Sequence, residues 1–481
     1  MKYETVIGLE VHVHLNTNSK IFCSCSTEFG QAPNTQTCPI CLGLPGVLPV
    51  LNMKAMEFAV KTALALKCNV AAFTKFDRKH YFYPDLPKNF QISQYDQPLA
   101  EKGIVEIDLA GIIKPIRIKR VHLEEDAGKL LHAERESYVD LNRTGIPLLE
   151  IVTEPDISSP EEAYLYLDEL KAIIKYLEVS DCDMEKGSLR CDANISIREA
   201  GSKSLGTKVE LKNMNSFKGV RDALQFEVQR QSEVLTKDKQ VIQETRLWDE
   251  ERQKTYSMRS KEEAHDYRYF PEPDLMPYTF DKDFIESIKK TVPELPRERK
   301  KRFINDFALG AYDAGILTAD KDLADYFEEC LGILNLPKTI ANWLIGDVMG
   351  QINLRRSSIS KLGLSVKNLT GMIRLIEKEA ISQKTAKEIL PLIIDTGKSA
   401  EGIIKEKGLK QISDEVELAK IIDETIMHNQ KTVDDFLNGN EKAVMFLVGE
   451  VMKKTKGRAN PKIVNALLKE RLFLRRKNNN S

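Results

Sequence analysis

The sequence predicts an α+β protein: an N-terminal domain built on an antiparallel sheet with helices, followed by an all-α helical domain and a small helical tail. Apolar and polar residues alternate with period two in several segments before Ser216, as in strands with one buried face. After Pro296 this alternation disappears, and apolar residues recur every three or four positions, as in amphipathic helices. A chain of 481 residues is too long for one core and predicts about three domains of ~150 residues each.

Composition excludes several classes of protein. With 42% hydrophobic and 30% charged residues the chain is ordinary for a globular protein, and its formal net charge of −1 hides any local asymmetry. No apolar run reaches the ~18 residues of a membrane span. Met1 leads straight into a strand pattern without a signal peptide. We therefore expect a cytoplasmic protein with no membrane contact.

The first predicted strand covers residues 6–15. Leu9, Val11, Val13 and Leu15 share its apolar face, and Glu10, His12 and His14 share the other. A half-exposed strand can carry such polar residues without any function. However, a carboxylate and an imidazole two positions apart on one pleat are also what a hard-metal or phosphate site requires.

Two cysteine pairs follow, separated by a short loop rich in turn residues. Cys23 and Cys25 form the first pair, and Cys38 and Cys41 form the second. This spacing predicts a tetrahedral Cys₄ zinc site, although the first pair is tighter than the usual Cys-x-x-Cys. Four thiolates leave no open coordination position, so the zinc would be structural. The alternative is four unrelated buried thiols. The remaining cysteines are predicted to be small buried hydrophobes: Cys68, Cys182, Cys191 and Cys330.

A short amphipathic helix is predicted over residues 55–66, and an aromatic, cation-bearing segment follows at 76–98. Prolines at 84, 87 and 98 exclude a long helix or a central strand there. We expect an ordered loop with strand-like pieces that lines a cavity or an interface. Lys79 and Lys88 are its most notable cations, and simple solvation of both is the alternative.

A hairpin is predicted over 103–123 with its turn at Gly111. The parity of the apolar positions shifts between Ile118 and Val121, which indicates a bulge. The stretch 122–156 then places carboxylates among strand-forming residues. Like charges packed together raise one another's pKa unless a cation is present, so the stretch implies a counter-charge such as Mg²⁺. A solvated strand end is the alternative. The carboxylates are Glu124, Glu125, Asp126, Asp140, Glu150, Glu154 and Asp156.

The next elements repeat the opening pattern. A helix with Pro160 at an early position has a predicted buried stripe of Tyr164, Leu167, Leu170 and Ile174. Two strands follow at 189–198 and 207–213, then a helix at 216–236 and an aromatic loop at 266–274. We interpret the strands as one antiparallel sheet whose polar face is a site. The polar faces of the two strands carry Arg190, Asp192, Asn194, Ser196 and Arg198, and Lys208, Glu210 and Lys212.

Helices are predicted for the rest of the chain, with domain boundaries near 293–296 and 398–408. Plausible helix caps are Ser382, Ser413 and Asp414. The predicted helices cover 299–314, 323–331, 340–354, 364–379, 385–395, 415–429, 441–455 and 461–477. From Glu450 onward ten Lys or Arg stand against two Glu. This local excess favours a polyanion partner, with a merely solubilising tail as the alternative.

Together these features suggest phosphoryl transfer on or near a nucleic acid. The chain has no phosphate-binding Gly-x-x-x-x-Gly-Lys-Ser/Thr loop, no kinase Gly-rich loop and no His-Arg-Asp signature. It also lacks a Gly-x-Ser-x-Gly elbow. Any nucleotide site would therefore be of a type that has none of these common motifs. The sequence also does not predict hydrolysis of an amide.

Long motifs in the same order resemble the B-subunit family of the bacterial tRNA-dependent aspartyl/glutamyl amidotransferases (GatB). They include VIGLEVHVHL, FDRKHYFYPDLPK, HLEEDAGK, VDLNRTGIPLLEIVTEPD, GSLRCDANIS, VELKNMNSF, DYRYFPEPDL and FLVGEVMKKTKGRANP. The resemblance covers nearly the whole chain. It implies a cradle domain (1–293) with an ATP- and Mg²⁺-dependent kinase site and the Cys₄ zinc site, a helical domain (294–405) and a YqeY-like tail (406–481) that binds tRNA.

The resemblance implies a reaction. Such subunits phosphorylate the side-chain carboxylate of Glu on tRNA(Gln), or of Asp on tRNA(Asn), and ammonia then displaces the phosphate. Activation is needed because a carboxylate is a poor electrophile, and the protein supplies chiefly positioning and charge stabilisation. The implied partners are an amidase A subunit that supplies the ammonia, a small C subunit completing a heterotrimer, the misacylated tRNA(Gln) and/or tRNA(Asn), and the mischarging synthetase.

The resemblance also assigns roles to residues. Glu125, Glu150 and Glu10 are the expected catalytic residues, and Lys79 and Lys88 match the entrance of an ammonia tunnel. His14 is not counted as a ligand, because this family often has Glu or Gln there. Glu124, Asp126, Asp140 and Glu154 are left with support or surface roles. A non-catalytic, zinc-bearing tRNA-binding or assembly subunit is the alternative function. The expected Mg²⁺ ligands are His12, Glu10, Glu125, Glu150, Asp192 and Glu210, and the expected tRNA contacts are Lys453, Lys454, Lys456 and Arg458.

Overall fold

The structure is a computed structural model, and it describes residues 3–133, 135–260, 267–408, 415–455 and 459–479. The chain divides into two compact units, Met1–Pro296 and Arg297–Ser481. The first unit has one large buried core, whereas the second has two separate hydrophobic clusters. In the described part of the chain, no helix is long and apolar enough to cross a membrane.

A nine-stranded sheet forms the centre of the first unit in the described residues. Its strand order is β14-β13-β12-β11-β1-β10-β7-β6-β2. Neighbouring strands run antiparallel, as predicted, except for the parallel pair β12 and β13. The strands are β1 (Tyr3–His14), β2 (Asn69–Val70), β6 (Ala100–Leu109), β7 (Ile112–Glu125), β10 (Pro147–Thr153), β11 (Leu189–Glu199), β12 (Val209–Lys212), β13 (Glu244–Asp249) and β14 (Lys254–Ser260).

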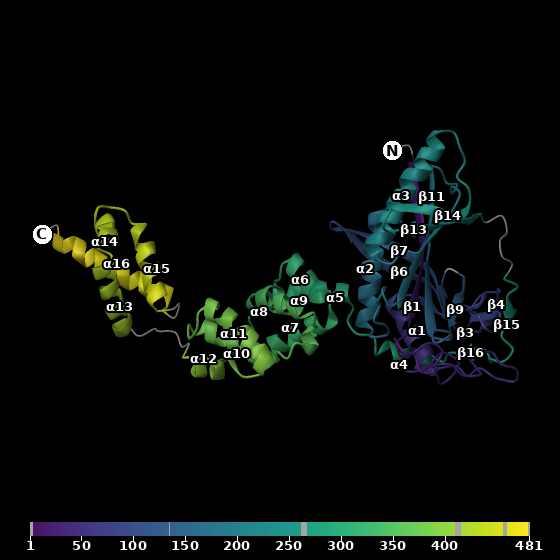
Figure 1. Cartoon of the computed structure of the whole chain (residues 1–481), viewed down its shortest axis with the longest axis horizontal. Coiled ribbons are helices and arrows are strands. Elements are labelled where there is room, and N and C mark those ends of the chain that lie inside the picture. The colour runs from purple at the N-terminus through teal and green to yellow at the C-terminus, as the bar shows by residue number, and fades with distance from the viewer. Residues whose placement is uncertain (1–2, 134, 261–266, 409–414, 456–458, 480–481) are drawn as a thin grey trace. The chain divides into compact units, whose positions relative to one another are not determined.

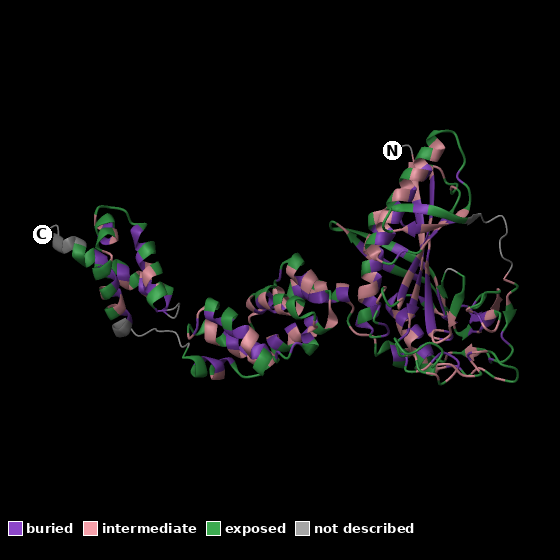
Figure 2. Cartoon of the chain, viewed as in Figure 1, coloured by how far each residue is buried: buried purple, intermediate pink, exposed green. Residues whose placement is uncertain are grey.

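Helices cover the apolar face of this sheet. The predicted inward residues Leu9, Val11 and Val13 of β1 are fully buried, and α2 and α3 pack on each other and on the strands (Figures 1 and 2). The side chain of Ser159 caps α2, and that of Ser216 caps α3. The opposite face of the sheet is therefore left for polar side chains. The helices of this unit are α1 (Met53–Ala65), α2 (Pro160–Tyr176), α3 (Phe217–Thr236) and α4 (Lys282–Lys289).

Smaller sheets lie beside the large one. Strand β5 contacts β7, so the three-stranded sheet β15-β4-β5 lies next to the predicted acidic stretch. The predicted bulge in β7 is confirmed: Arg120 pairs with Val152 and Ile118 with Thr153, which leaves Lys119 as the extra residue. The short strands are β3 (Phe73–Thr74), β4 (Asp77–His80), β5 (Phe90–Ser93), β8 (Lys129–His132), β9 (Ser137–Asp140), β15 (Phe270–Pro271) and β16 (Tyr278–Thr279).

The described part of the second unit is helical, as predicted. Ser382 caps α11 through its side chain, and the other two predicted caps, Ser413 and Asp414, lie outside the described residues. A π-helical turn at Leu344–Val348 joins α8 and α9. The helices are α5 (Pro296–Phe307), α6 (Ala311–Thr318), α7 (Lys321–Ile333), α8 (Pro337–Trp343), α9 (Met349–Arg355), α10 (Val366–Glu377), α11 (Gln383–Thr396), α12 (Ala400–Lys407), α13 (Glu415–His428), α14 (Gln430–Leu437), α15 (Ala443–Lys454) and α16 (Pro461–Asn479).

Three local predictions were wrong. The single helix expected over 299–314 is two helices, because Ala308 has a φ of 51° and so leaves the right-handed region between α5 and α6. Tyr164 is only half-buried, and Tyr166 is the fully buried tyrosine of α2. Helices α4, α12 and α14 were not predicted, since each is only eight residues long.

Candidate functional site

Three polar side chains stand side by side on three neighbouring strands. His12 on β1 lies opposite Glu150 on β10, and Glu150 lies opposite His122 on β7. Directly opposed residues of antiparallel strands project from the same face, so the three side chains form one row. His122 is 1% exposed and Glu150 is 9% exposed. The three side chains thus form a largely buried polar row on one face of the sheet.

Glu124 completes this group. Its carboxylate lies 3.7 Å from His12 Nε2 and 3.9 Å from His122 Nε2. The Glu150 carboxylate lies 3.5 Å from His12 Nε2 and 3.3 Å from His122 Nε2. The ligand atoms of His12, Glu124 and Glu150 all lie within 4.8 Å of one another. One imidazole and two carboxylates that converge in this way match the ligands of a divalent cation.

The electrostatics of the group follow from its composition. Burial alone would raise the pKa of Glu150, but His122 and His12 outweigh it and hold that pKa well below its ordinary value. Burial would likewise lower the pKa of His12, yet its contact with Glu150 and the charge of Glu124 raise it. The contacts with the two imidazoles therefore favour the ionised form of the Glu150 carboxylate.

The predicted ligands Glu10, Asp192 and Glu210 lie on the same polar face but in a neighbouring group. Glu10 accepts a hydrogen bond of 2.8 Å from Asn194. Lys212 Nζ lies 2.5 Å from Asp192 and 3.4 Å from Glu210. These three acids are already satisfied by an amide and a cation. In the described residues they do not join the cluster of His12, Glu124 and Glu150.

Asp126 anchors a second buried ion cluster at the end of β7. Its carboxylate receives hydrogen bonds of 2.9 and 3.0 Å from Arg190 and lies 2.6 Å from His14 Nε2. Arg143 lies 3.4 Å away. Burial would raise the pKa of Asp126, but these cations hold it well below its ordinary value. Asp126 thus positions Arg190, whose backbone lies opposite His12 on the neighbouring strand.

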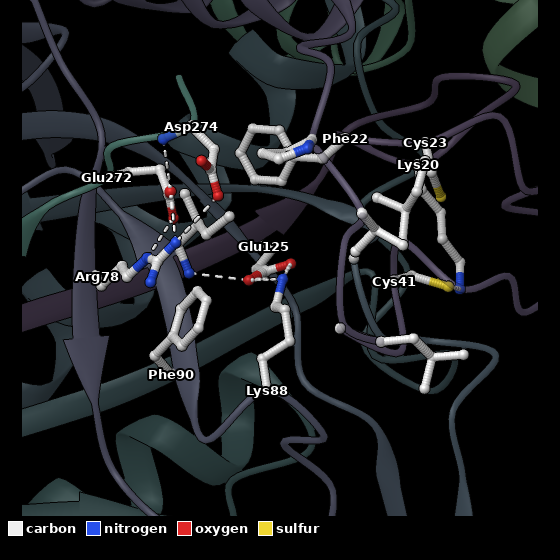
Figure 3. Close-up of a pocket in the computed structure, with 17 residues that line it drawn as sticks. Lys20, Phe22, Cys23, Cys41, Arg78, Lys88, Phe90, Glu125, Glu272 and Asp274 are labelled. Atoms are coloured by element: carbon white, nitrogen blue, oxygen red, sulfur yellow. Dashed lines mark hydrogen bonds and ion pairs between the residues drawn. The ribbon is translucent and has the colours of Figure 1, made fainter. Parts of the chain in front are cut away.

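Glu125 faces a different environment from Glu124. Its carboxylate pairs with Lys88 Nζ at 2.5 Å and accepts a hydrogen bond of 2.9 Å from the Ile92 N–H. It lines a cavity of about 190 Å³ together with Arg78 and Lys20 (Figure 3). Arg78 makes a bidentate pair with Glu272, at 2.8 and 2.9 Å. Glu125 and Glu150, which the sequence analysis grouped as ligands of one metal, are therefore not brought together.

The two lysines predicted at the tunnel entrance, Lys79 and Lys88, have different surroundings. Lys79 stands 4.9 Å from the Tyr267 ring centroid. Burial would lower its pKa, but Glu124, Tyr269 and Glu150 outweigh it and raise that pKa. Lys79 therefore belongs electrostatically to the acidic group, whereas Lys88 belongs to the cavity. Arg78, the residue before Lys79 in β4, lines the cavity, and successive residues of a strand point to opposite faces, so Lys79 points away from the cavity.

The four predicted zinc ligands come together. Their sulfur atoms all lie within 4.8 Å of one another, and the four residues are Cys23, Cys25, Cys38 and Cys41. The Cys38 N–H donates a hydrogen bond of 3.2 Å to Cys41 Sγ. The hydrogen bond from Cys23, with help from Cys38 and the charge of Lys20, lowers the pKa of Cys41 to about 4. Four clustered sulfur atoms fit the coordination of a tetrahedral zinc ion. The other cysteines are buried, as predicted.

The predicted tRNA contacts are only partly described. Lys453 and Lys454 lie in the last turn of α15, and Lys454 Nζ lies 3.9 Å from Glu424. Lys456 and Arg458 lie outside the described residues.

Sequence reasoning did not single out His122, and it left Glu124 with a support or surface role. A surface position is wrong for Glu124, because its residue is 3% exposed inside the acidic group. The signal was present in the alternation of β7. Val121 and Leu123 face the core, so His122 and Glu124 must share the polar face, and Glu125 must leave it.

Known proteins resemble this chain over nearly its whole length. Residues 5–286 match the family model described as the GatB/GatE catalytic domain, and residues 325–472 match the one described as the GatB domain. The chain is 56% identical over 476 residues to the B subunit of the aspartyl/glutamyl-tRNA(Asn/Gln) amidotransferase of Carboxydothermus hydrogenoformans, covering 98% of this chain and 99% of that one. It is 55% identical over 471 residues to the corresponding B subunit of Brevibacillus brevis, covering 98% of each.

Proposed function

The chain belongs to the family of aspartyl/glutamyl-tRNA(Asn/Gln) amidotransferase B subunits, and from this premise we propose that it carries the kinase and amide-forming steps. It would bind Glu-tRNA(Gln) and/or Asp-tRNA(Asn), phosphorylate the side-chain carboxylate with ATP, and let ammonia displace the phosphate. The γ-phosphoryl group ends on the carboxylate oxygen, and ADP leaves. Ammonia then attacks the acyl carbon, inorganic phosphate departs, and the amide remains.

The single observation that carries this proposal is the convergence of His12, Glu124 and Glu150. Two carboxylates and one imidazole that converge this closely make a donor set that suits Mg²⁺. Bound there, Mg²⁺ would neutralise charge on the ATP phosphates. His122 holds Glu150 in place from the neighbouring strand. Lys79 and Arg190 add positive charge around the acids.

Glu10, Asp192 and Glu210 would support this site from the neighbouring strands, with Lys212 as their counter-ion. Glu125 and Lys88 would line the path by which ammonia reaches the acyl phosphate, since both face the cavity on the other side of β7. Lys79 would stand where that path meets the acidic group. These roles refine the expected set: Glu124 joins the metal ligands, and Glu125 moves to the ammonia path.

The four cysteines would hold a structural Zn²⁺. The amidase A subunit and the small C subunit would be the partners, and the mischarging synthetase a further one, in the cytoplasm. The basic C-terminal residues, including Lys453 and Lys454, would contact the tRNA backbone. We propose three domains, 1–293, 294–405 and 406–481. The first would carry the reaction, and the last would bind the tRNA.

The decisive experiment measures ATP-dependent, misacylated-tRNA-dependent phosphate release by the assembled complex. We expect Glu124→Gln and Glu150→Gln to lower release at least about 100-fold, because charge stabilisation at the phosphoryl group is lost. Glu57→Gln, at an exposed surface pair, is the matched control. Both misacylated tRNAs are tested in parallel to establish which amide is made. Undiminished release by both site variants would remove the kinase role and favour the non-catalytic tRNA-binding or assembly subunit.

A further inference from the structure

A buried lysine stands beside the cysteine cluster. Lys20 has 0% of its surface exposed and is among the largest fully buried side chains of the described residues. Its backbone N–H donates to the Cys25 carbonyl at 3.0 Å, so it belongs to the same loop as the first cysteine pair. Burial of an ammonium group is costly unless an anion or several acceptors surround it.

The partners of Lys20 identify that anion. Its Nζ lies 3.7 Å from Cys41 Sγ and 3.4 Å from the Leu141 carbonyl oxygen. In the described part of the chain, no carboxylate lies within 4 Å of it. Glu125, which lines the same cavity, is already paired with Lys88 at 2.5 Å. The polar atoms nearest to Lys20 Nζ are therefore a cysteine sulfur and a backbone carbonyl oxygen, and Figure 3 shows Nζ beside the sulfur.

We propose that Lys20 is the buried counter-charge of the zinc centre, a residue that sets how firmly the metal is held. Zn²⁺ bound by four thiolates carries a net charge of about −2. Lys20 supplies one compensating positive charge from outside the ligand set, and the Cys38 N–H adds a hydrogen bond to the same sulfur, at 3.2 Å. The inference rests on the proposed structural zinc and adds the residue that stabilises it.

The same residue ties the zinc loop to the large sheet. Lys20 reaches the Leu141 carbonyl, and the Ile21 N–H donates to the Gly145 carbonyl at 2.8 Å. The segment 141–145 carries Arg143, which contacts Asp126 at the end of β7. Lys20 and Cys41 also form part of the cavity wall that Glu125 shares. Loss of the counter-charge would therefore loosen one wall of that cavity.

The test uses three substitutions in the full-length chain within its complex. Lys20→Gln keeps a hydrogen-bond donor but removes the charge, Lys20→Met removes both, and Lys20→Arg keeps the charge. Lys54→Met, at an exposed lysine, is the control. Zinc transfer to an excess of a chromophoric chelator is followed under native conditions. We expect release at least about tenfold faster for Lys20→Gln and Lys20→Met, and unchanged for Lys54→Met.

A second measurement separates a charge role from packing. The thermal midpoint is compared with and without zinc for each variant. Lys20→Gln should lower the thermal midpoint of the zinc-loaded protein. It should leave the midpoint of the zinc-free protein unchanged or raised, because without zinc the cysteine cluster has less anionic charge for Lys20 to compensate. An equal drop in both states, or wild-type zinc retention in Lys20→Gln, overturns the inference. If neither uncharged variant folds, zinc retention in Lys20→Arg supports it and zinc loss overturns it. Wild-type protein without zinc would instead refute the proposed zinc site itself.

Discussion

Glu124 and Glu125 are adjacent in the sequence and face different sites. Glu124 lies with His12 and Glu150, whereas Glu125 pairs with Lys88. The cause is the pleat of β7, in which consecutive side chains point to opposite faces. Family resemblance drew attention to Glu125, but the alternation of the strand places Glu124, and not Glu125, with His12 and Glu150. Both acids are buried, so exposure alone would not distinguish them.

This difference predicts that substitutions of Glu124 and Glu125 have different effects on metal binding. Glu124→Gln should weaken Mn²⁺ binding, used as a probe for Mg²⁺, by at least about tenfold, because a ligand carboxylate is lost. Glu125→Gln should bind Mn²⁺ like the wild type, because its carboxylate lies on the other face. Isothermal titration of each purified variant measures this. Equal weakening in both variants would contradict the assignment.

Asp126 supports a prediction about stability and pH. Asp126→Asn should cost about 3–5 kcal/mol of unfolding free energy in the first unit, because Arg190 and His14 lose a buried anion. The native pKa of Asp126 is depressed, so its contribution is full above the unfolded pKa of about 3.9 and disappears as pH falls through the native value. The gap between wild type and variant should therefore close at acid pH.

The fluorescence of Trp248 reports this unfolding in a Trp343→Phe background, because the chain has two tryptophans and Trp248 lies in the first unit. Glu154→Gln, a nearby acid of the same stretch, serves as the control. A gap that persists unchanged at pH 3 would show that charge pairing is not what Asp126 contributes.

At the scale of elements, the hairpin of β6 and β7 places the acidic group. Gly103 lies in β6, where a Cβ atom would clash with Cys68 Sγ and come within 2.7 Å of the Leu66 carbonyl oxygen. The Leu66 contact is with backbone, which cannot move away cheaply. Gly8 in β1 offers a matched comparison, since a Cβ there would meet Thr153 Oγ1 at 3.9 Å, an ordinary contact.

Gly103→Ala should therefore destabilise the first unit by about 1–3 kcal/mol through overpacking, and Gly8→Ala should change its stability little. Denaturant unfolding monitored by Trp248 tests both variants under identical conditions. A similar cost for the two substitutions would mean that loss of glycine in a strand, rather than the Leu66 contact, is responsible.

At the scale of the whole molecule, the chain separates into two units with distinct cores. The acidic group, the cavity and the cysteine cluster all lie within Met1–Pro296. We expect a fragment of residues 1–296 to fold, retain zinc, and bind Mn²⁺ with an affinity within about threefold of the full chain. Metal analysis and titration of that fragment test this, and loss of both metals would show that the second unit is needed to form the sites.

The basic C-terminus carries the matching prediction for tRNA. Deleting residues from Lys453 onward should lower tRNA affinity and flatten its dependence on salt, because fewer phosphates are neutralised. Filter binding at several salt concentrations measures both quantities, and phosphate release at saturating tRNA serves as the control for an intact kinase site. Unchanged affinity and salt slope would contradict tRNA binding by this segment.

The sequence by itself determined the α+β class, the polar and apolar faces of β1 and β11, the positions of the four clustered cysteines and the family. The class, the strand faces and the cysteine cluster follow from local periodicity and spacing, which depend on backbone geometry a few residues long, and the family follows from the resemblance of long motifs. Tertiary structure alone decided which acids meet, because β10 pairs between β1 and β7 and brings residues 12, 124 and 150 together. It also placed Lys79 near Glu124 and Glu150, paired Lys88 with Glu125, and buried Lys20 against Cys41. Such encounters depend on strand order, and strand order is fixed by long-range packing that no local pattern records.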